Sequence, residues 1–191
     1  AGRSIENLHP DVLVDAILAK KNLGTTKEMA PLTIGLGPGF TAGQDVDVVI
    51  ETMRGSTLGK IYKEGSAIPN TGVPGMVAGY SKERVIHAPG SGQFQPERAI
   101  GDLVAKGDVL GFLMPDHIPV TASMPGLLRG MIREGYPVTK GLKIMDIEPR
   151  IEERGLCFQI SDKAKKIGDS VYQVIREYED YKTEGQRSCV N

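Results

Sequence analysis

Cationic and hydroxyl side chains gather in the polar stretches that follow the apolar runs of the first 71 residues. Arg54 follows the run "VDVVIE", and others lie in "KKNLGTT" and "GSAIPNTG". Arginine, lysine, hydroxyls and glycine amides bind phosphates and other oxyanions. Strand-end loops that meet at one edge of an α/β sheet are where such folds bind ligands. The predicted ligand-binding residues are Lys20, Lys21, Asn22, Thr25, Thr26, Gly35, Gly37, Gly39, Arg54, Ser66, Asn70 and Thr71.

The glycine stretch "GLGPGFTAG" does not match the dinucleotide-binding fingerprint. Counted from Gly35, the pattern G-x-G-x-x-G requires a third glycine where Phe40 stands. The fingerprint also needs a helix that opens on the loop, whereas "DVDVVIET" alternates like a strand. The glycines therefore either shape a tight turn or form one wall of an anion pocket, and both interpretations stay open.

Composition narrows the class of protein. A formal net charge of -1 over 191 residues gives no reason to expect a nucleic-acid partner. The two cysteines, Cys157 and Cys189, form no C-x-x-C pair, so neither a zinc site nor a disulfide framework is expected. No apolar run approaches the roughly 20 residues of a membrane span. We expect a cytoplasmic protein with no metal site.

An internal repeat marks the middle of the chain. Residues 86–113 align without a gap with residues 120–147, at a constant offset of 34. Each half is predicted to form short strands joined by a Gly turn and a Lys-Gly turn, and two such halves predict a pseudo-symmetric β sandwich. The identical pairs are Ala88/Ala122, Gly92/Gly126, Gly101/Gly135, Val104/Val138, Lys106/Lys140 and Gly107/Gly141.

The repeated region, with "HAPGSGQF" and "GDLVAKGDVL", resembles the barrel-sandwich fold of biotinyl and lipoyl carrier domains. Carriers of that kind are modified on a lysine at the hairpin that joins the halves. The corresponding hairpin here, Leu113 to Val120, has His117 at its tip and no lysine. The resemblance therefore implies the fold without covalent biotin or lipoate.

The whole chain resembles the YqeB type of accessory proteins of selenium-dependent molybdenum hydroxylases. The matching motifs include "DVLVDAILAKKNLGTT", "APLTIGLGPGFTAGQDVDVVIETMRG" and "CFQISDKAKKIG". Members of that family usually begin with a nucleotide-binding-like segment that contains "GGGD", which this chain lacks. The resemblance implies a role in maturing the selenium-containing molybdenum site, with the hydroxylase or its cofactor-maturation proteins as partners.

The predicted fold class is α/β plus β. A partial α/β, Rossmann-like segment is expected at residues 1–80, a barrel-sandwich hybrid of two pseudo-symmetric halves at 81–150, and a strand and helix at 151–191 that pack on the first segment. The helix is expected to begin at Ser161 or Asp162. Its apolar face holds Ile167, Val171, Val174, Ile175 and Tyr178.

Three functions stay open. The leading hypothesis is an accessory factor that binds a nucleotide, a pterin phosphate or an oxyanion. The second is an enzyme that transfers a group to or from a nucleotide or a selenium compound near Arg54, although no catalytic residues can be assembled. The third is a structural interaction module. Cys157 is expected to fill space in a half-buried strand rather than carry selenium or sulfur, and a homo-oligomer is expected.

Overall fold

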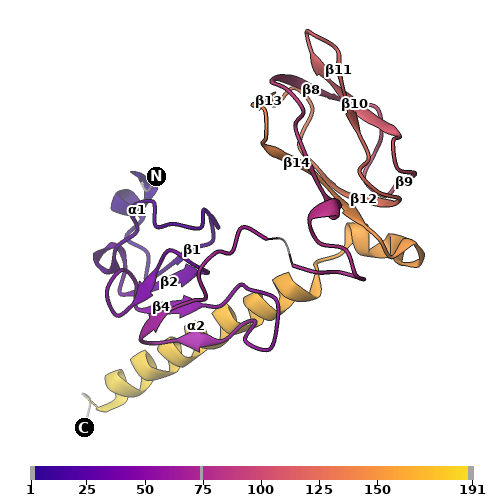
Figure 1. Ribbon diagram of the computed structural model, residues 1–191. Helices are drawn as coiled ribbons and strands as arrows, with labels where there is room; N and C mark the ends of the chain where they lie inside the picture. Colours follow the sequence, from indigo (N-terminus) through magenta and orange to yellow (C-terminus); the bar gives the residue numbers. More distant parts are fainter. Residues whose placement is uncertain (1–2, 74, 189–191) are drawn as a thin grey trace. The chain divides into compact units, whose positions relative to one another are not determined.

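A computed structural model describes residues 3–73 and 75–188. The chain forms two compact units (Figure 1). The first holds the residues up to Thr71 together with those from Ser161 onward, and the second holds Gly72–Ile160. The units meet at residues 71–72 and 160–161, whereas the sequence places the boundaries at 80–81 and 150–151.

A four-stranded sheet forms the centre of the first unit. Its strands lie in the order β1-β2-β4-β5, and they are Val12–Asp15, Leu32–Leu36, Val48–Ile50 and Ile61–Tyr62. The first three are parallel, and β5 runs antiparallel to β4. Two further short strands, β3 (Thr41–Ala42) and β6 (Gly65–Ser66), pair with each other. The parallel strands bring the loops after β1, β2 and β4 to one edge.

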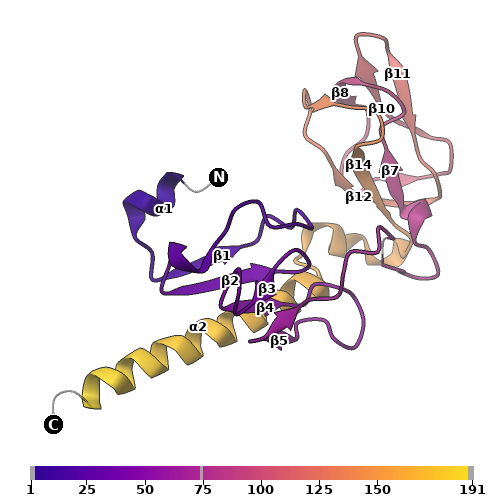
Figure 2. The same ribbon diagram turned by 60° about the vertical axis from the view of Figure 1, so that its left-hand side comes forward.

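The long helix α2 (Asp162–Ser188) lies along this sheet in both views (Figures 1 and 2). Ile167 and Val174 are buried among the apolar side chains of β2 and β4, and the other three side chains of the expected face, Val171, Ile175 and Tyr178, pack around them. A single apolar stripe thus fastens the helix to one face of the sheet. The other helical segments of the unit are α1 (Arg3–Leu8) and the 3₁₀ turn η1 (Lys27–Met29).

The second unit consists of two four-stranded antiparallel sheets, one in the order β11-β10-β8-β13 and the other in the order β7-β14-β12-β9. Fully buried side chains from both sheets, including Phe94, Leu110 and Ile147, form its core. The 3₁₀ segments η2 (Lys82–Arg84) and η3 (Ile151–Phe158) flank the sheets. The strands are Val85–His87, Gly92–Pro96, Leu103–Val104, Val109–Met114, Ile118–Thr121, Gly126–Met131, Pro137–Val138 and Lys143–Glu148, numbered β7 to β14 in that order.

The offset of 34 residues relates the two sheets strand by strand. It carries β9 onto β13 and β10 onto β14 with identical bounds. Hydrogen bonds repeat as well, because Gly107 donates its N–H to the carbonyl of Ala122 at 2.8 Å and Gly141 donates to that of Ala88 at 2.9 Å. Each half of the repeat therefore contributes strands to both sheets and cannot bury its apolar side chains alone.

The predicted combination of a Rossmann-like α/β remnant with an inserted barrel-sandwich hybrid and a C-terminal helix is wrong. Rossmann-like halves place a helix between successive parallel strands. Between β1 and β4 the described residues form only the turn η1 and strand β3, and the helix that covers the sheet comes from the end of the chain. The chain is mostly sheet with one long helix. The residues before that helix form η3 rather than a strand.

Within the described ranges, no helix combines the length and the apolar character that crossing a bilayer requires.

Candidate functional site

Three cationic side chains approach one another at the carboxyl edge of the parallel strands in the first unit. Lys20 lies in the loop after β1, Arg54 in the loop after β4, and Lys163 in the first turn of α2. The pKa of the half-buried Lys163 is lowered, first by burial and then by the positive charges of Lys20 and Arg54. The carboxylate of Glu51 acts in the opposite direction. We call Lys20, Arg54 and Lys163, together with Glu51, the basic cluster.

The packing of α2 explains why Lys163 reaches this edge. One turn and two turns further along the helix, Lys166 packs its stem against Gly59 and Ser170 donates a hydrogen bond to the Gly59 carbonyl at 2.7 Å. The N–H of Gly59 in turn donates to the carbonyl of Glu51 at 3.0 Å. Residues three and four apart share a helix face. Lys163 therefore continues this row beyond the end of β4.

Glu51 is the buried anchor of the loops around the cluster. Its carboxylate is fully buried, with one oxygen (Oε1) accepting the N–H of Met53 and the other (Oε2) accepting that of Ile68, both at 2.8 Å. A buried carboxylate of this kind is stable only when such donors surround it. The two bonds tie the loop that carries Arg54, and the segment after β6, to the end of β4.

The glycine loop lies beside the loop of Lys20. Gly39 has a φ of +108°, and a Cβ there would come within 2.5 Å of the Cα of Lys21. A Cβ on Gly37 would collide with the hydroxyl of Thr52. At Gly35, a Cβ would lie 2.6 Å from the ring of Phe40. These glycines permit close backbone packing, and Gly39 joins the glycine loop to the basic loop.

Asn22 and Thr25 shape the basic loop from within. The side-chain oxygen of Asn22 accepts the N–H groups of Gly24 and Thr25 at 2.8 Å, and the hydroxyl of Thr25 donates to Asp15 at 2.7 Å. Lys20 has a φ of +65°, in the left-handed region. Internal bonds thus hold the exposed Lys20 side chain in a tightly folded loop.

The other predicted ligand-binding residues lie elsewhere in the same unit. Thr26 contacts the carboxylate of Glu28, and Ser66 pairs its hydroxyl with that of Thr41 at 3.1 Å. Asn70 and Thr71 lie on the exposed segment that ends the first stretch of the unit. Of the predicted residues, Lys20 and Arg54 therefore belong to the basic cluster, and Lys21 and Gly39 lie where its loops meet.

Sequence reasoning missed Lys163 and Glu51. A usable signal existed in "SDKAKKIG", which places three lysines in the first turns of a helix. The N-terminal end of a helix disfavours cations, so lysines there indicate a negative partner. Glu51 also gave a signal, because a carboxylate directly follows the apolar run "VDVVI".

The residues weighed for cysteine, histidine and metal chemistry lie outside this cluster. Cys157 is half-buried in η3, and Cys189 lies outside the described residues. His117, in the β10–β11 hairpin, stacks on Phe112 with ring centroids 4.0 Å apart. Within the part of the chain that the structure describes, no three His, Cys, Asp or Glu residues gather as metal ligands would.

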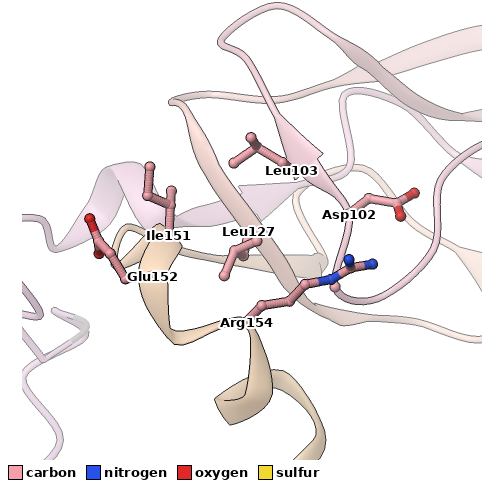
Figure 3. A pocket seen from close by; sticks show the side chains of 7 residues that line it. Asp102, Leu103, Leu127, Ile151, Glu152 and Arg154 are labelled. Carbon is pink, nitrogen blue, oxygen red and sulfur yellow. The ribbon is translucent and has the colours of Figure 1, made fainter.

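A cavity of about 460 Å³ opens in the second unit, where η3 crosses β12 and the edge strand β9. Figure 3 shows the apolar side chains of Leu103, Leu127 and Ile151, with Asp102, Glu152 and Arg154 around them. Leu103 is 63% exposed and Ile151 is 49% exposed. The cavity can accept an apolar group with charged neighbours, and none of the predicted ligand-binding residues lines it.

Comparison with known proteins gives one relative in sequence. No protein-family model matches the chain. Over 171 residues it is 46% identical to the "Uncharacterized protein YqeB" of Escherichia coli (strain K12). The match covers 90% of this chain but 31% of that protein, so the chain spans about a third of the length of the curated relative.

Solved structures resemble the chain weakly. A succinylglutamate desuccinylase/aspartoacylase from Rhodobacter sphaeroides matches 35% of this chain and 22% of its own at 19% identity, with a TM-score of 0.30. A succinylglutamate desuccinylase from Silicibacter sp. matches 62% and 45% at 19% identity, with a TM-score of 0.32. An aspartoacylase family protein from Mesorhizobium loti matches 51% and 33% at 17% identity, with a TM-score of 0.33. No activity is inferred from likenesses of this size.

Proposed function

From the premise that this chain is of the YqeB type over 90% of its length, we propose that it binds a small anion at the basic cluster. In the wider proposal, it does so in the cytoplasm as an accessory factor in the maturation of selenium-dependent molybdenum hydroxylases. The ligand class comprises a nucleotide, a pterin phosphate and a free oxyanion, which share negatively charged oxygens.

The observation that carries the anion site is the approach of Lys20 and Arg54 to the half-buried Lys163. Like charges brought together away from water repel one another, and the repulsion disfavours the charged form of the lysine. One carboxylate, Glu51, opposes three cations, and both of its oxygens already accept backbone hydrogen bonds. An anion bound among the three cations relieves the repulsion.

The accessory role draws its support from the relationship to the YqeB type and from the second unit. The cavity of Figure 3 exposes apolar side chains beside charged ones, as a surface that contacts another protein does. We assign this cavity to contact with the hydroxylase or with its cofactor-maturation proteins. This role involves neither nucleic acid nor a membrane.

One observation favours the rival function, a group-transfer enzyme. An amine that is desolvated and placed beside other cations loses its proton more readily and becomes a nucleophile. Lys163 meets this description. The enzyme alternative predicts turnover of a nucleotide or a selenium compound that is lost in Lys163→Gln, whereas the binding function predicts occupancy without turnover.

Ligand-dependent stabilisation tests the anion site. Wild type and Arg54→Ala are unfolded with and without ATP, NAD, molybdate and selenophosphate. A ligand at a hundredfold excess over its Kd adds about 2.7 kcal/mol to the free energy of unfolding. We expect a shift in wild type that Arg54→Ala loses. Arg98→Ala is the matched control, because Arg98 is an exposed arginine of the second unit.

The accessory role is tested in cells that lack the protein. We expect their hydroxylase to accumulate without its selenium-containing centre, and expression of wild type or Arg98→Ala to restore selenium incorporation. Arg54→Ala is expected to fail. Normal selenium content in cells without the protein contradicts the accessory role and leaves the anion site to be judged by the binding experiment.

A further inference from the structure

The charges of the basic cluster indicate what kind of anion it takes. With Lys163 protonated, three positive side chains and the single carboxylate of Glu51 leave a net charge of +2. A singly charged anion neutralises half of this excess, and a doubly charged anion neutralises all of it. Complementary charge in a partly desolvated site decides which ligand is held.

Lys163 is the variable member of the cluster. Lys20 and Arg54 are exposed, and water screens their charges, whereas Lys163 is half-buried at the end of the sheet. The groups that face Lys163 are Lys20 from the loop after β1, Glu51 at the end of β4, and Arg54 from the loop that follows. Burial and the two cations lower the pKa of Lys163, and Glu51 counteracts them in part.

We propose that the cluster binds a doubly charged oxyanion of the sulfate or phosphate type, and that the ligand stays bound only while Lys163 holds its proton. This inference rests on the proposed anion site and adds the charge of the ligand and its release by alkali. When Lys163 loses its proton, the net charge falls to +1 and a dianion is no longer balanced.

The sign of the coupling follows from linkage. A dianion beside Lys163 favours the charged ammonium and therefore raises the pKa of the lysine above that of the free protein. Between the free and bound values of this pKa, binding takes up a proton. The Kd consequently rises by up to tenfold per pH unit in that interval and is constant below it.

Titrations at several pH values test the proposal. Sulfate serves as a free dianion, adenosine monophosphate as a dianion at the end of a larger molecule, and nitrate as a single charge. Stabilisation of the full chain gives a Kd for each anion from about pH 7.5 to about pH 9.5, below the ordinary pKa range of Lys20. The variants are Lys163→Gln and, as the control, Lys165→Gln, which changes an exposed lysine of the same turn.

The account expects sulfate or adenosine monophosphate to bind wild type and Lys165→Gln with a Kd that rises several-fold over this range. Nitrate is expected to bind at least tenfold more weakly, and Lys163→Gln to bind dianions weakly and without pH dependence. Two results overturn the inference alone, namely a Kd independent of pH in wild type and nitrate binding as tight as sulfate binding. Failure of every anion to bind overturns the anion site itself.

Discussion

The backbone of Lys21 lies against Gly39, so close that a Cβ on the glycine would come within 2.5 Å of the Cα of Lys21. The two residues belong to different loops, one after β1 and the other after β2. This contact fixes the basic loop, and with it Lys20, against the glycine loop. The glycine stretch thus contributes to the proposed anion site by positioning a cation, without the geometry of a dinucleotide fingerprint.

Gly39→Ala is therefore expected to weaken anion binding as well as stability. The new methyl group meets the main chain of Lys21, and the φ of +108° disfavours any side chain. Gly43→Ala is the matched control, since Gly43 has a φ of +83° and the nearest atom to its Cβ is 3.9 Å away. Both variants are expected to lose about 1 kcal/mol of unfolding free energy from the backbone alone. A Kd for sulfate that rises equally in both would contradict the positioning role of Gly39.

Glu51→Gln tests the buried anchor. A glutamine presents one acceptor oxygen where the carboxylate presents two, so the N–H of Met53 or of Ile68 loses its partner. An unsatisfied buried donor costs about 1–3 kcal/mol, and chemical denaturation should show a loss of this size. Glu64→Gln, at an exposed glutamate of the same unit, should leave the free energy of unfolding unchanged. An equal loss in both variants would argue against the anchor.

The local elements of the first unit could be predicted from the sequence, but their arrangement could not. The apolar run "LTIGL" predicts a strand, and β2 (Leu32–Leu36) confirms it. A run of alternating residues carries no information about which segment covers the sheet. The covering helix comes from residue 162 onward rather than from between the strands, and this is why the Rossmann-like class was wrong.

The candidate site shows the same limit. Arg54 and Lys20 could be selected because each follows a strand of a parallel sheet. Lys163 lies far along the chain, and its position depends on the packing of α2 against Gly59 through Lys166 and Ser170. Cys157 shows that apolar neighbours alone do not distinguish a strand from a 3₁₀ helix.

Acid should destabilise the second unit through Glu148. Its side chain is 1% exposed and is held by Arg150 at 2.8 Å and Arg129 at 3.0 Å. Burial acts to raise the pKa of Glu148, but the hydrogen bonds and charge of Arg150, with the bond from Arg129, lower it from 4.5 to about 2. The contribution of Glu148 to stability is therefore complete above pH 4.5 and is lost as the pH falls toward 2, by about 3 kcal/mol in total.

Unfolding of wild type and Glu148→Gln over this pH range checks the prediction. The difference in unfolding free energy between the two proteins should shrink as the pH falls, because protonated Glu148 resembles glutamine. Glu97→Gln, at an exposed site of the same unit, should follow wild type throughout. A difference that stays constant down to about pH 2 would contradict the assignment.

Two leucines of the cavity in Figure 3 should separate partner contact from stability. Leu103 is 63% exposed and Leu127 is 2% exposed. Leu103→Ser is expected to change the unfolding free energy by less than about 0.5 kcal/mol, whereas Leu127→Ala should lower it by about 2–5 kcal/mol. If the cavity contacts the hydroxylase, Leu103→Ser weakens co-purification of the two proteins. Unchanged co-purification would remove the cavity from the proposed interface.

The most direct test of the anion site is a sulfate titration of the ¹⁵N-labelled chain, followed through its backbone amide signals. The account predicts saturable shifts of Lys20, Lys21, Gly39 and Arg54, with the signals around Leu103 and Ile151 unmoved. Arg54→Ala should abolish the shifts, and Arg98→Ala should preserve them. Saturable shifts that appear only away from the basic cluster, or no saturable shifts at all, would contradict the account.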